Sequence, residues 1–351
     1  MILFISRYPN EEGERDGMMQ RVIAVDRRFA DLERAYLWIR FFGNWRRTKE
    51  SPSGRLTVHR VNFFLHFPFI IALASKSMGV YIHSVHNGLR SLPLYLHGNL
   101  FTDLHGLFPE EQAYYGKGFA ALLYGWIERI AVRRSRGIIV VSDAMGEHLR
   151  GKYGGIGSRV YTVPIFDELP IGGRGEGGAG PIVALYSGGS QKWQNVDMMM
   201  EAMARMRERC SFVLLTPDLP YFERKIAEHG LGECVKTLTA AKSEVYGYYM
   251  GADLGFVLRD NSELNRAACP TKLVEYMACG LVPVVLEPGI GDFAARGYAW
   301  LSLERFTNGD LPSREELEAM RQTNYRVIAS MRDSAAETME RVIADFTGKG
   351  G

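Results

Sequence analysis

The sequence has few of the residues that build disulfide frameworks or zinc sites. Its 351 residues include four cysteines, and no two of them form a CxxC pair. The four thiols lie in segments that otherwise have the composition of a protein core, at Cys210, Cys234, Cys269 and Cys279. We therefore expect the reduced thiols of a cytoplasmic protein and neither a disulfide framework nor a zinc site.

Long apolar runs are missing as well. The longest, residues 63–74, is about half as long as a membrane-spanning helix needs to be, and His66 and Pro68 interrupt it. The apolar run of residues 1–6 is too short for a signal peptide, and no basic segment precedes it. The sequence therefore predicts neither a membrane span nor a secretion signal.

Three ligand-binding motifs are also absent. The sequence contains neither GxGxxG nor GxxxxGK followed by Ser or Thr, which argues against dehydrogenases and P-loop ATPases. It has no Asp-x-Asp motif to hold a divalent metal. We expect no metal and no other cofactor.

Charge is unevenly distributed between the two halves of the chain. Residues 1–166 carry 22 Lys and Arg against 14 Asp and Glu (+8), whereas residues 167–351 carry 20 against 26 (−6). Residues 27–60 alone hold nine basic and three acidic residues, interleaved with aromatic ones. Such a stretch suits phosphates or the headgroups of an anionic membrane, and equally a solvated rim over a buried strand. No nucleic-acid-binding motif accompanies it, so we expect no nucleic acid partner.

Short apolar runs rich in β-branched residues alternate with longer helical patterns. This alternation predicts an α/β protein with parallel sheets covered by helices on both faces. In the first half we expect strands at residues 2–6, 35–42, 56–61, 80–83, 99–103, 137–141 and 160–163. In the second half we expect them at residues 182–186, 212–215, 235–238, 254–258 and 282–286.

A glycine-rich stretch divides the chain. Six glycines occur within residues 172–180, a composition typical of a flexible linker. We expect a first domain at residues 1–166, a linker at 167–180 and a second domain at 181–329.

Three further helices are predicted in the second half. Residues 196–209 place four methionines and a valine on one apolar stripe, which we expect to pack in the core. The capping boxes Ser313-x-x-Glu316 and Ser334-x-x-Glu337 predict the starts of two consecutive helices.

Two strand-to-helix junctions of the second domain suggest a ligand site. Gly188 and Gly189 end its first strand, and Lys192 precedes the next helix. Paired glycines let a ligand approach the backbone, and a helix N-terminus favours an anion, although such pairs often form only a turn.

The second junction carries more chemistry. A buried strand leads through Arg259 to Pro270, a residue that suits the first turn of a helix. Lys272 and Glu275 then lie on one helix face at the carboxyl ends of the strands, where open α/β sheets bind ligands. Because a lysine in the first turn opposes the helix dipole, we expect an anionic ligand there.

The second junction lies within the run ADLGFVLRDNSELNRAACPTKLVEYMACGLVPVV, residues 252–285. This run resembles the donor-binding signature of GT-B glycosyltransferases of the retaining family GT4. RDGMMQR at 15–21 is similar to the family's glycine loop, DLHGLFPEE at 103–111 to its acceptor segment, and VVSDAM at 140–145 to a strand end. The resemblance implies two Rossmann-like domains facing each other across a cleft. It also implies a final helix, about residues 330–347, that packs back on the first domain.

For the donor nucleotide, the resemblance implies that Glu275 binds the ribose hydroxyls. The family's other glutamate falls on Ala267, its arginine on Gly189 and its lysine on Gln194, so two phosphate-binding cations are missing from their usual places. We expect nearby cations to replace them, with Lys272 as the main candidate beside Lys192, Arg259 and Arg266. The expected donor-binding residues are Gly17, Gly188, Gly189, Lys192, Thr271, Lys272, Leu273 and Glu275.

In the first domain, the resemblance implies that His105 reaches the transferred sugar and that Gly17 opens a helix towards the donor phosphates. A structural histidine bonded to a carbonyl is the other interpretation of His105. We expect His83 and His86 to be structural.

The residues and the resemblance together predict a glycosyltransferase. It would move a sugar from a nucleoside-diphosphate sugar to a saccharide or lipid-linked saccharide, with retention and without a metal. The candidate catalytic residues are His105, Lys272 and Arg259, and we expect a cytoplasmic protein with peripheral contact to an anionic membrane. The alternatives are a catalytically silent nucleotide-sugar-binding protein, a nucleotide-sugar epimerase and a phosphorylase. Neither the paired carboxylates of an epimerase nor a pyridoxal lysine is evident.

Overall fold

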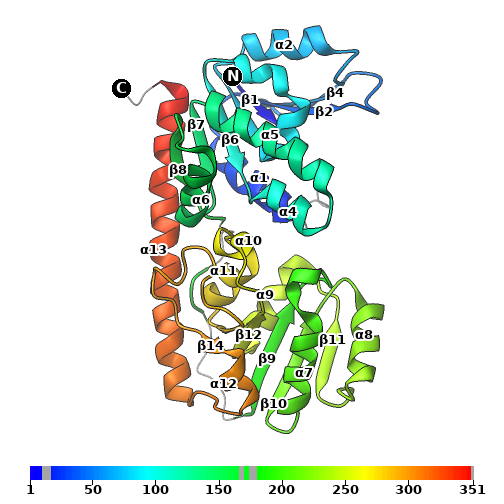
Figure 1. The fold of residues 1–351 in the computed structure, drawn as a ribbon, viewed down its shortest axis with the longest axis vertical. Coiled ribbons are helices and arrows are strands. Elements are labelled where there is room, and N and C mark those ends of the chain that lie inside the picture. The colour runs from blue at the N-terminus through cyan, green and yellow to red at the C-terminus, as the bar shows by residue number, and fades with distance from the viewer. Residues whose placement is uncertain (10–16, 166–169, 174–179, 349–351) are drawn as a thin grey trace. The chain divides into compact units, whose positions relative to one another are not determined.

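The computed structural model describes residues 1–9, 17–165, 170–173 and 180–348. The chain divides into two compact units (Figure 1). Unit 1 contains residues 1–165 and 333–351, and unit 2 contains residues 166–332. Among the described helices, none is both long enough and apolar enough to cross a bilayer.

Unit 1 is built on an eight-stranded sheet in the order β3-β4-β2-β1-β5-β6-β7-β8. The strands are β1 (Ile2–Ile5), β2 (Arg34–Arg40), β3 (Thr48–Ser53), β4 (Leu56–Asn62), β5 (Gly79–His83), β6 (Leu100–Leu104), β7 (Gly137–Val140) and β8 (Arg159–Thr162). The helices are α1 (Gly17–Arg28), α2 (Phe67–Ser75), α3 (Ser84–Arg90), η2 (Leu92–Leu96), α4 (Phe108–Tyr114), α5 (Gly118–Arg134) and α6 (Asp143–Tyr153). All seven predicted strands are present, with ends that differ by one or two residues.

The edge strand β3 was not predicted. It pairs antiparallel with β4, whereas the other neighbouring strands of the sheet are parallel. All six of its residues are exposed, and Pro52 lies within it. Because neither face of β3 is buried, its sequence has no apolar alternation that would reveal a strand, and proline is tolerated at a sheet edge.

Unit 2 has a six-stranded, all-parallel sheet in the order β11-β10-β9-β12-β13-β14. The strands are β9 (Ile182–Ser187), β10 (Cys210–Leu215), β11 (Val235–Leu238), β12 (Leu254–Val257), β13 (Val282–Val285) and β14 (Leu301–Ser302). The helices are η3 (Lys192–Gln194), α7 (Val196–Met206), α8 (Leu219–Glu228), α9 (Lys242–Gly251), α10 (Glu263–Arg266), α11 (Thr271–Ala278), α12 (Leu303–Thr307) and α13 (Arg314–Thr347). This is a doubly wound sheet. The order in which strands are added reverses between β9 and β12, and ligands bind at such a switch point.

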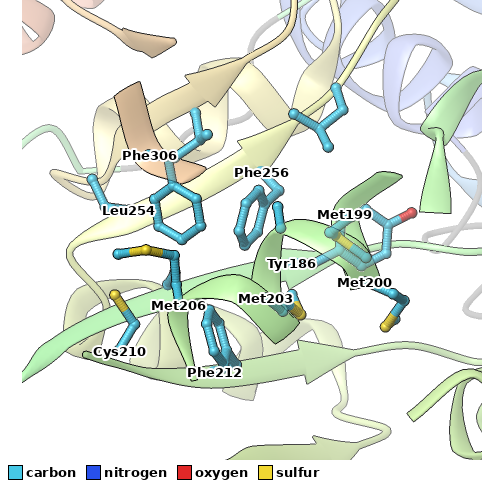
Figure 2. Packing of buried hydrophobic residues seen from close by; sticks show 14 of the residues in the cluster. Tyr186, Met199, Met200, Met203, Met206, Cys210, Phe212, Leu254, Phe256 and Phe306 are labelled. Carbon is cyan, nitrogen blue, oxygen red and sulfur yellow. The ribbon is translucent and has the colours of Figure 1, made fainter. Parts of the chain in front are cut away.

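The core of unit 2 contains the predicted methionine stripe of α7 (Figure 2). Met199, Met200, Met203 and Met206 are buried among aromatic side chains from β9, β10 and β12. The flexible thioether side chain of methionine fills gaps between these larger rings, so the stripe is packing, as expected.

The C-terminal segment forms one helix of 34 residues, α13, about 51 Å long. The first capping box is confirmed, because the Ser313 N–H donates to the Glu316 carboxylate (2.7 Å) and the Glu316 N–H donates to the Ser313 hydroxyl (3.1 Å). The second predicted helix start was wrong, since Ser334 lies inside α13. Residues 333–347 pack in unit 1, where Phe346 is fully buried, so tertiary burial overrides the local capping signal.

Most of the predicted glycine-rich linker lies outside the described residues. Within residues 170–173, the Gly172 N–H donates to the carbonyl of Ala278 (3.0 Å).

Candidate active site

The loops that leave β9 and β12 meet at the switch point of unit 2. Asn195 joins them, because its amide donates to the Leu258 carbonyl (3.0 Å) and to the Asp260 carboxylate (2.9 Å). Gly188, directly after β9, has φ +148°, and a Cβ there would lie 2.9 Å from the Lys272 Nζ atom. Only glycine fits this backbone conformation comfortably, and it lets the lysine approach the main chain closely.

Lys272 projects from the first turn of α11 into this junction. Its Nζ donates to the Gln194 Oε1 atom (3.0 Å) and lies 3.9 Å from the centre of the Tyr186 ring. Although part of the side chain reaches solvent, burial of the ammonium group and the nearby Arg259 charge hold the pKa of Lys272 well below its usual value, against an opposing effect of Glu275. The site therefore destabilises this positive charge when no anion is bound.

Arg259 follows β12 and is half-buried. Its guanidinium donates to the Asn265 Oδ1 atom (3.0 Å). Burial lowers the pKa of Arg259 to about 10, so it remains charged at neutral pH. Within the described ranges, neither Arg259 nor Lys272 has a carboxylate at ion-pair distance. Two desolvated cations with neutral partners form a site for an anion.

Glu275 lies one turn beyond Lys272 on α11. Its Oε2 atom accepts a hydrogen bond from the Tyr249 hydroxyl (3.2 Å), and the side chain is partly exposed. A fixed, accessible carboxylate beside an anion site can accept hydrogen bonds from hydroxyl groups of a bound ligand. Of the flanking residues, Thr271 is partly exposed, whereas the Leu273 side chain is fully buried.

A buried ion pair joins helix α1 and strand β6 of unit 1. Arg21 of α1 makes two bonds to the Asp103 carboxylate of β6, at 3.0 and 3.1 Å, and donates to the carbonyls of Val163 and Pro164. The Tyr81 hydroxyl also donates to Asp103 (2.9 Å). Burial disfavours the Asp103 charge, but Arg21 and the neighbouring histidines outweigh it and hold the pKa well below its usual range.

His105 lies beside this ion pair, just after β6. Its Nε2 atom is 3.5 Å from the Asp103 carboxylate and 3.4 Å from Nδ1 of His83. His83 is fully buried, and burial lowers its pKa to about 3, so it is neutral at physiological pH. The His105 Nδ1 atom has no hydrogen-bond partner among the described residues, although the ring is partly exposed. The contact with Asp103 and His83 does not fit the carbonyl-bonded interpretation of His105.

His83, Asp103 and His105 are close enough to be considered as metal ligands. However, Arg21 and Tyr81 already occupy both Asp103 oxygens, and the guanidinium would repel a cation. This donor set fits a histidine held by an ion pair better than a metal centre.

The two units match two models of one enzyme family. Residues 2–165 match the model described as Glycosyltransferase Family 4, and residues 181–305 match the model described as Glycosyl transferases group 1. The chain belongs to the family 4, group 1 glycosyltransferases. No curated protein sequence matches this glycosyltransferase significantly.

Solved structures share the GT-B fold of this glycosyltransferase. Sucrose-phosphate synthase from Thermosynechococcus elongatus matches with TM-score 0.70 and 14% identity over 99% of both chains. HepE from Anabaena, in complex with UDP-glucose, matches with TM-score 0.67 and 15% identity over 97% of this chain and 99% of that one. The UDP-forming α,α-trehalose-phosphate synthase from Burkholderia vietnamiensis matches with TM-score 0.62 and 11% identity over 99% of both.

The glycosyltransferase brings part of the expected donor set together. Gly188, Lys272 and Arg259 meet at the switch point, and Glu275 lies one turn away. Lys192 is exposed on η3, and Gly189 packs against Gln191 and Asp218.

Arg266 and Gly17 were also expected at the donor site. Arg266 is exposed and donates to Asn261 (2.6 Å). Gly17 begins α1 in unit 1, but residues 10–16 of the predicted glycine loop lie outside the described residues.

Several residues of the glycosyltransferase site escaped the sequence analysis. In unit 2 these are neutral partners of the charged groups, namely Tyr186, Tyr249 and Asn265, whereas Gln194 was named only as the place where the family's lysine is missing. In unit 1, Arg21 and Tyr81 hold Asp103. These residues come from six elements, α1, β5, β9, η3, α9 and α10, and nothing in a single sequence shows which distant side chains meet.

Proposed function

We propose that the enzyme transfers a sugar from a UDP-sugar to a saccharide or lipid-linked saccharide, with retention and without a metal. The observation that carries the proposal is the pair of cations at the unit 2 switch point, Lys272 and Arg259, whose partners among the described residues are all neutral. UDP is favoured as the nucleotide because HepE binds UDP-glucose and the trehalose-phosphate synthase is UDP-forming.

In this proposal the cations stabilise the departing diphosphate. The bond between the sugar C1 and the phosphate oxygen breaks, a bond from C1 to the acceptor oxygen forms, and the acceptor proton passes to the departing phosphate. Negative charge develops on UDP, and Lys272 and Arg259 lie ready to receive it. One such preorganised donor stabilises a transition state by about 3–4 kcal/mol. With two cations in place, the negative charge that develops on UDP can be stabilised without a metal ion.

We assign the remaining roles by chemistry. Glu275, held by Tyr249, accepts hydrogen bonds from the ribose hydroxyls. His105 contacts the transferred sugar, and Asp103 and neutral His83 fix the orientation of its ring.

Peripheral membrane contact through residues 27–60 remains part of the proposal. Phe42 and Trp45, in the loop after β2, are strongly exposed, and Arg46 and Arg47 beside them are exposed as well. Aromatic rings flanked by arginines suit an anionic membrane surface, where a lipid-linked acceptor would reside. Flotation with anionic vesicles tests this contact, and the Phe42→Ser/Trp45→Ser double variant should float less.

The function is tested by incubating the enzyme with each nucleotide sugar, with and without saccharide acceptors, and measuring the nucleoside diphosphate released. We expect release with a UDP-sugar, and its loss in Lys272→Met. Binding of UDP without turnover of any donor would instead favour the silent protein. Three departures from the family's pattern favour that alternative. Buried Ala267 takes the place of a glutamate, Gly189 that of an arginine and Gln194 that of a lysine.

A further inference from the structure

Exposed apolar side chains are concentrated in unit 1. Among the described residues, thirteen large apolar side chains are exposed, and eleven of them belong to unit 1. Unit 2 contributes only Met198 and Met250. Single exposed apolar side chains are common on proteins, whereas a contiguous group of them marks a binding surface.

One group of these side chains lies on the outer face of α5. Phe119, Leu122 and Trp126 are spaced by three and four residues, so they share one helix face, and they are 82%, 78% and 52% exposed. Further along α5, Arg129, Arg133 and Arg134 are exposed, and Arg129 and Arg133 continue the same three- and four-residue spacing. The outer face of α5 is therefore apolar in its first half and cationic in its second.

The acidic residue of α5 points the other way. Glu128 is fully buried, and its carboxylate accepts from Lys152 (2.6 Å) and from the Tyr153 hydroxyl (2.6 Å) of α6. Lys152 also donates to Glu110 of α4 (2.6 Å). Because Glu128 and Glu110 are paired with Lys152, their negative charges do not neutralise the arginines on the outer face of α5.

A groove of about 870 Å³ runs beside this face, between α4, α5 and the end of α6. Figure 1 shows α4 and α5 side by side. Small residues of α5 form part of its lining, namely Gly118, Ala121 and Gly125. Leu122 and Trp126 line it from the same helix, and Arg129 supplies positive charge, whereas Lys152 and Glu110 in the lining are paired with each other. Its shape and chemistry suit a hydrocarbon chain with an anionic head.

We propose that the outer face of α5 docks on a bilayer that contains anionic lipids. Phe119, Leu122 and Trp126 enter the boundary between headgroups and chains, and the groove receives one lipid chain. Arg129 and Arg133 contact lipid phosphates, the arrangement by which amphipathic helices lie in a membrane interface. This surface is distinct from residues 27–60 and does not depend on the transfer reaction.

The test measures binding of the full chain to vesicles of phosphatidylglycerol and phosphatidylcholine in equal amounts. We expect the double variant Phe119→Ser/Leu122→Ser to lower the partition coefficient by more than about tenfold. The matched control, Met198→Ser/Met250→Ser, removes exposed apolar side chains from unit 2 and should bind as the wild type does. Pure phosphatidylcholine vesicles should bind the wild type weakly. All these side chains are exposed, so the variants should keep the melting temperature.

A second readout locates the contact. Because Trp45 is also exposed, the measurement uses a Trp45→Phe background. Phosphatidylglycerol with brominated chains should quench the tryptophan fluorescence of that variant, and adding Trp126→Phe should remove most of the quenching. The proposal is overturned if the α5 double variant binds vesicles as well as the control, or if quenching survives Trp126→Phe. It is also overturned if the double variant only converts a dimer to a monomer in ultracentrifugation, because the face would then join two copies. Release of UDP from a UDP-sugar, measured without vesicles, reports on the transfer function separately.

Discussion

Arg21 on helix α1 of unit 1 and Lys272 on helix α11 of unit 2 have opposite electrostatic environments. Arg21 in unit 1 makes a two-bond ion pair with Asp103 and also bonds two carbonyls. Lys272 in unit 2 has only neutral partners, a glutamine oxygen and a tyrosine ring. A buried cation whose charge is matched by a carboxylate holds a structure together. A buried cation that lacks one is maintained for a ligand, at some cost to the folded state.

The largest effect should come from breaking the matched pair. Arg21→Met leaves the Asp103 carboxylate buried without its main partner, and we expect a loss of about 3–5 kcal/mol in the free energy of unfolding. Urea denaturation measures this. The double variant Arg21→Met/Asp103→Asn should recover much of the loss, since both charges are gone. Equal destabilisation of the single and double variants would show that the ion pair is not the cause.

Lys272, which has no carboxylate partner in the part of the chain that the structure describes, should show the opposite behaviour, with a loss of activity and no loss of stability. Lys272→Met should lower turnover by about 10²- to 10³-fold, because the departing diphosphate loses a preorganised donor. The same substitution should leave the melting temperature unchanged or raised, since it removes a desolvated charge. Steady-state kinetics and a thermal melt on the same sample test both parts. A clear drop in melting temperature would mean that Lys272 has the structural role of Arg21.

A substitution at Glu275 tests whether the unit 2 site binds the ribose of the nucleotide. Glu275→Gln should weaken UDP binding by about 1.5–3 kcal/mol, the range for a hydrogen bond to a charged group. Titration calorimetry should also show that the variant no longer distinguishes UDP from its 2′-deoxy form. If the variant still prefers the ribose form by the wild-type factor, another residue binds the hydroxyls.

The smallest effect concerns acid stability of unit 1. His83 has a folded-state pKa of about 3, below the unfolded value of about 6.5, so the unfolded chain binds the proton first as pH falls. The stability contribution of neutral His83 is complete above pH 6.5 and declines towards pH 3, by about 2 kcal/mol at pH 5. Unfolding curves of the wild type and His83→Leu between pH 7 and pH 5 compare the two slopes. A variant with the wild-type slope would assign the acid sensitivity to other groups.

The sequence predicted the parts of the fold that have a buried face. All twelve predicted strands exist, and ten of them are central strands filled by runs of apolar, β-branched residues, whereas β8 and β11 lie at sheet edges. The exposed strand β3 and the two-residue strand β14 (Leu301–Ser302) lack that pattern and were missed. Ser334 shows the opposite error, since a genuine local capping signal was overridden by burial of the helix end in unit 1.

The candidate site was predictable only as far as its charges and strand ends. Lys272, Arg259 and Glu275 could be named because strand ends, glycines and a helix start mark the switch point. The groups that give these charges their properties come from elsewhere, Gln194 from the β9 loop and Tyr249 from α9. Such contacts depend on side-chain packing across the sheet, which no local sequence pattern encodes.

The C-terminal helix α13 has a consequence for protein synthesis. Phe346 lies against the rings of Phe29, Tyr81 and Phe101, so the first sheet made by the ribosome lacks part of its core until all of unit 2 has been translated. Until then, the apolar surface that Phe346 covers in unit 1 is exposed on the nascent chain. Chaperone dependence during translation should be set by the N-terminal half, even though its strands emerge first.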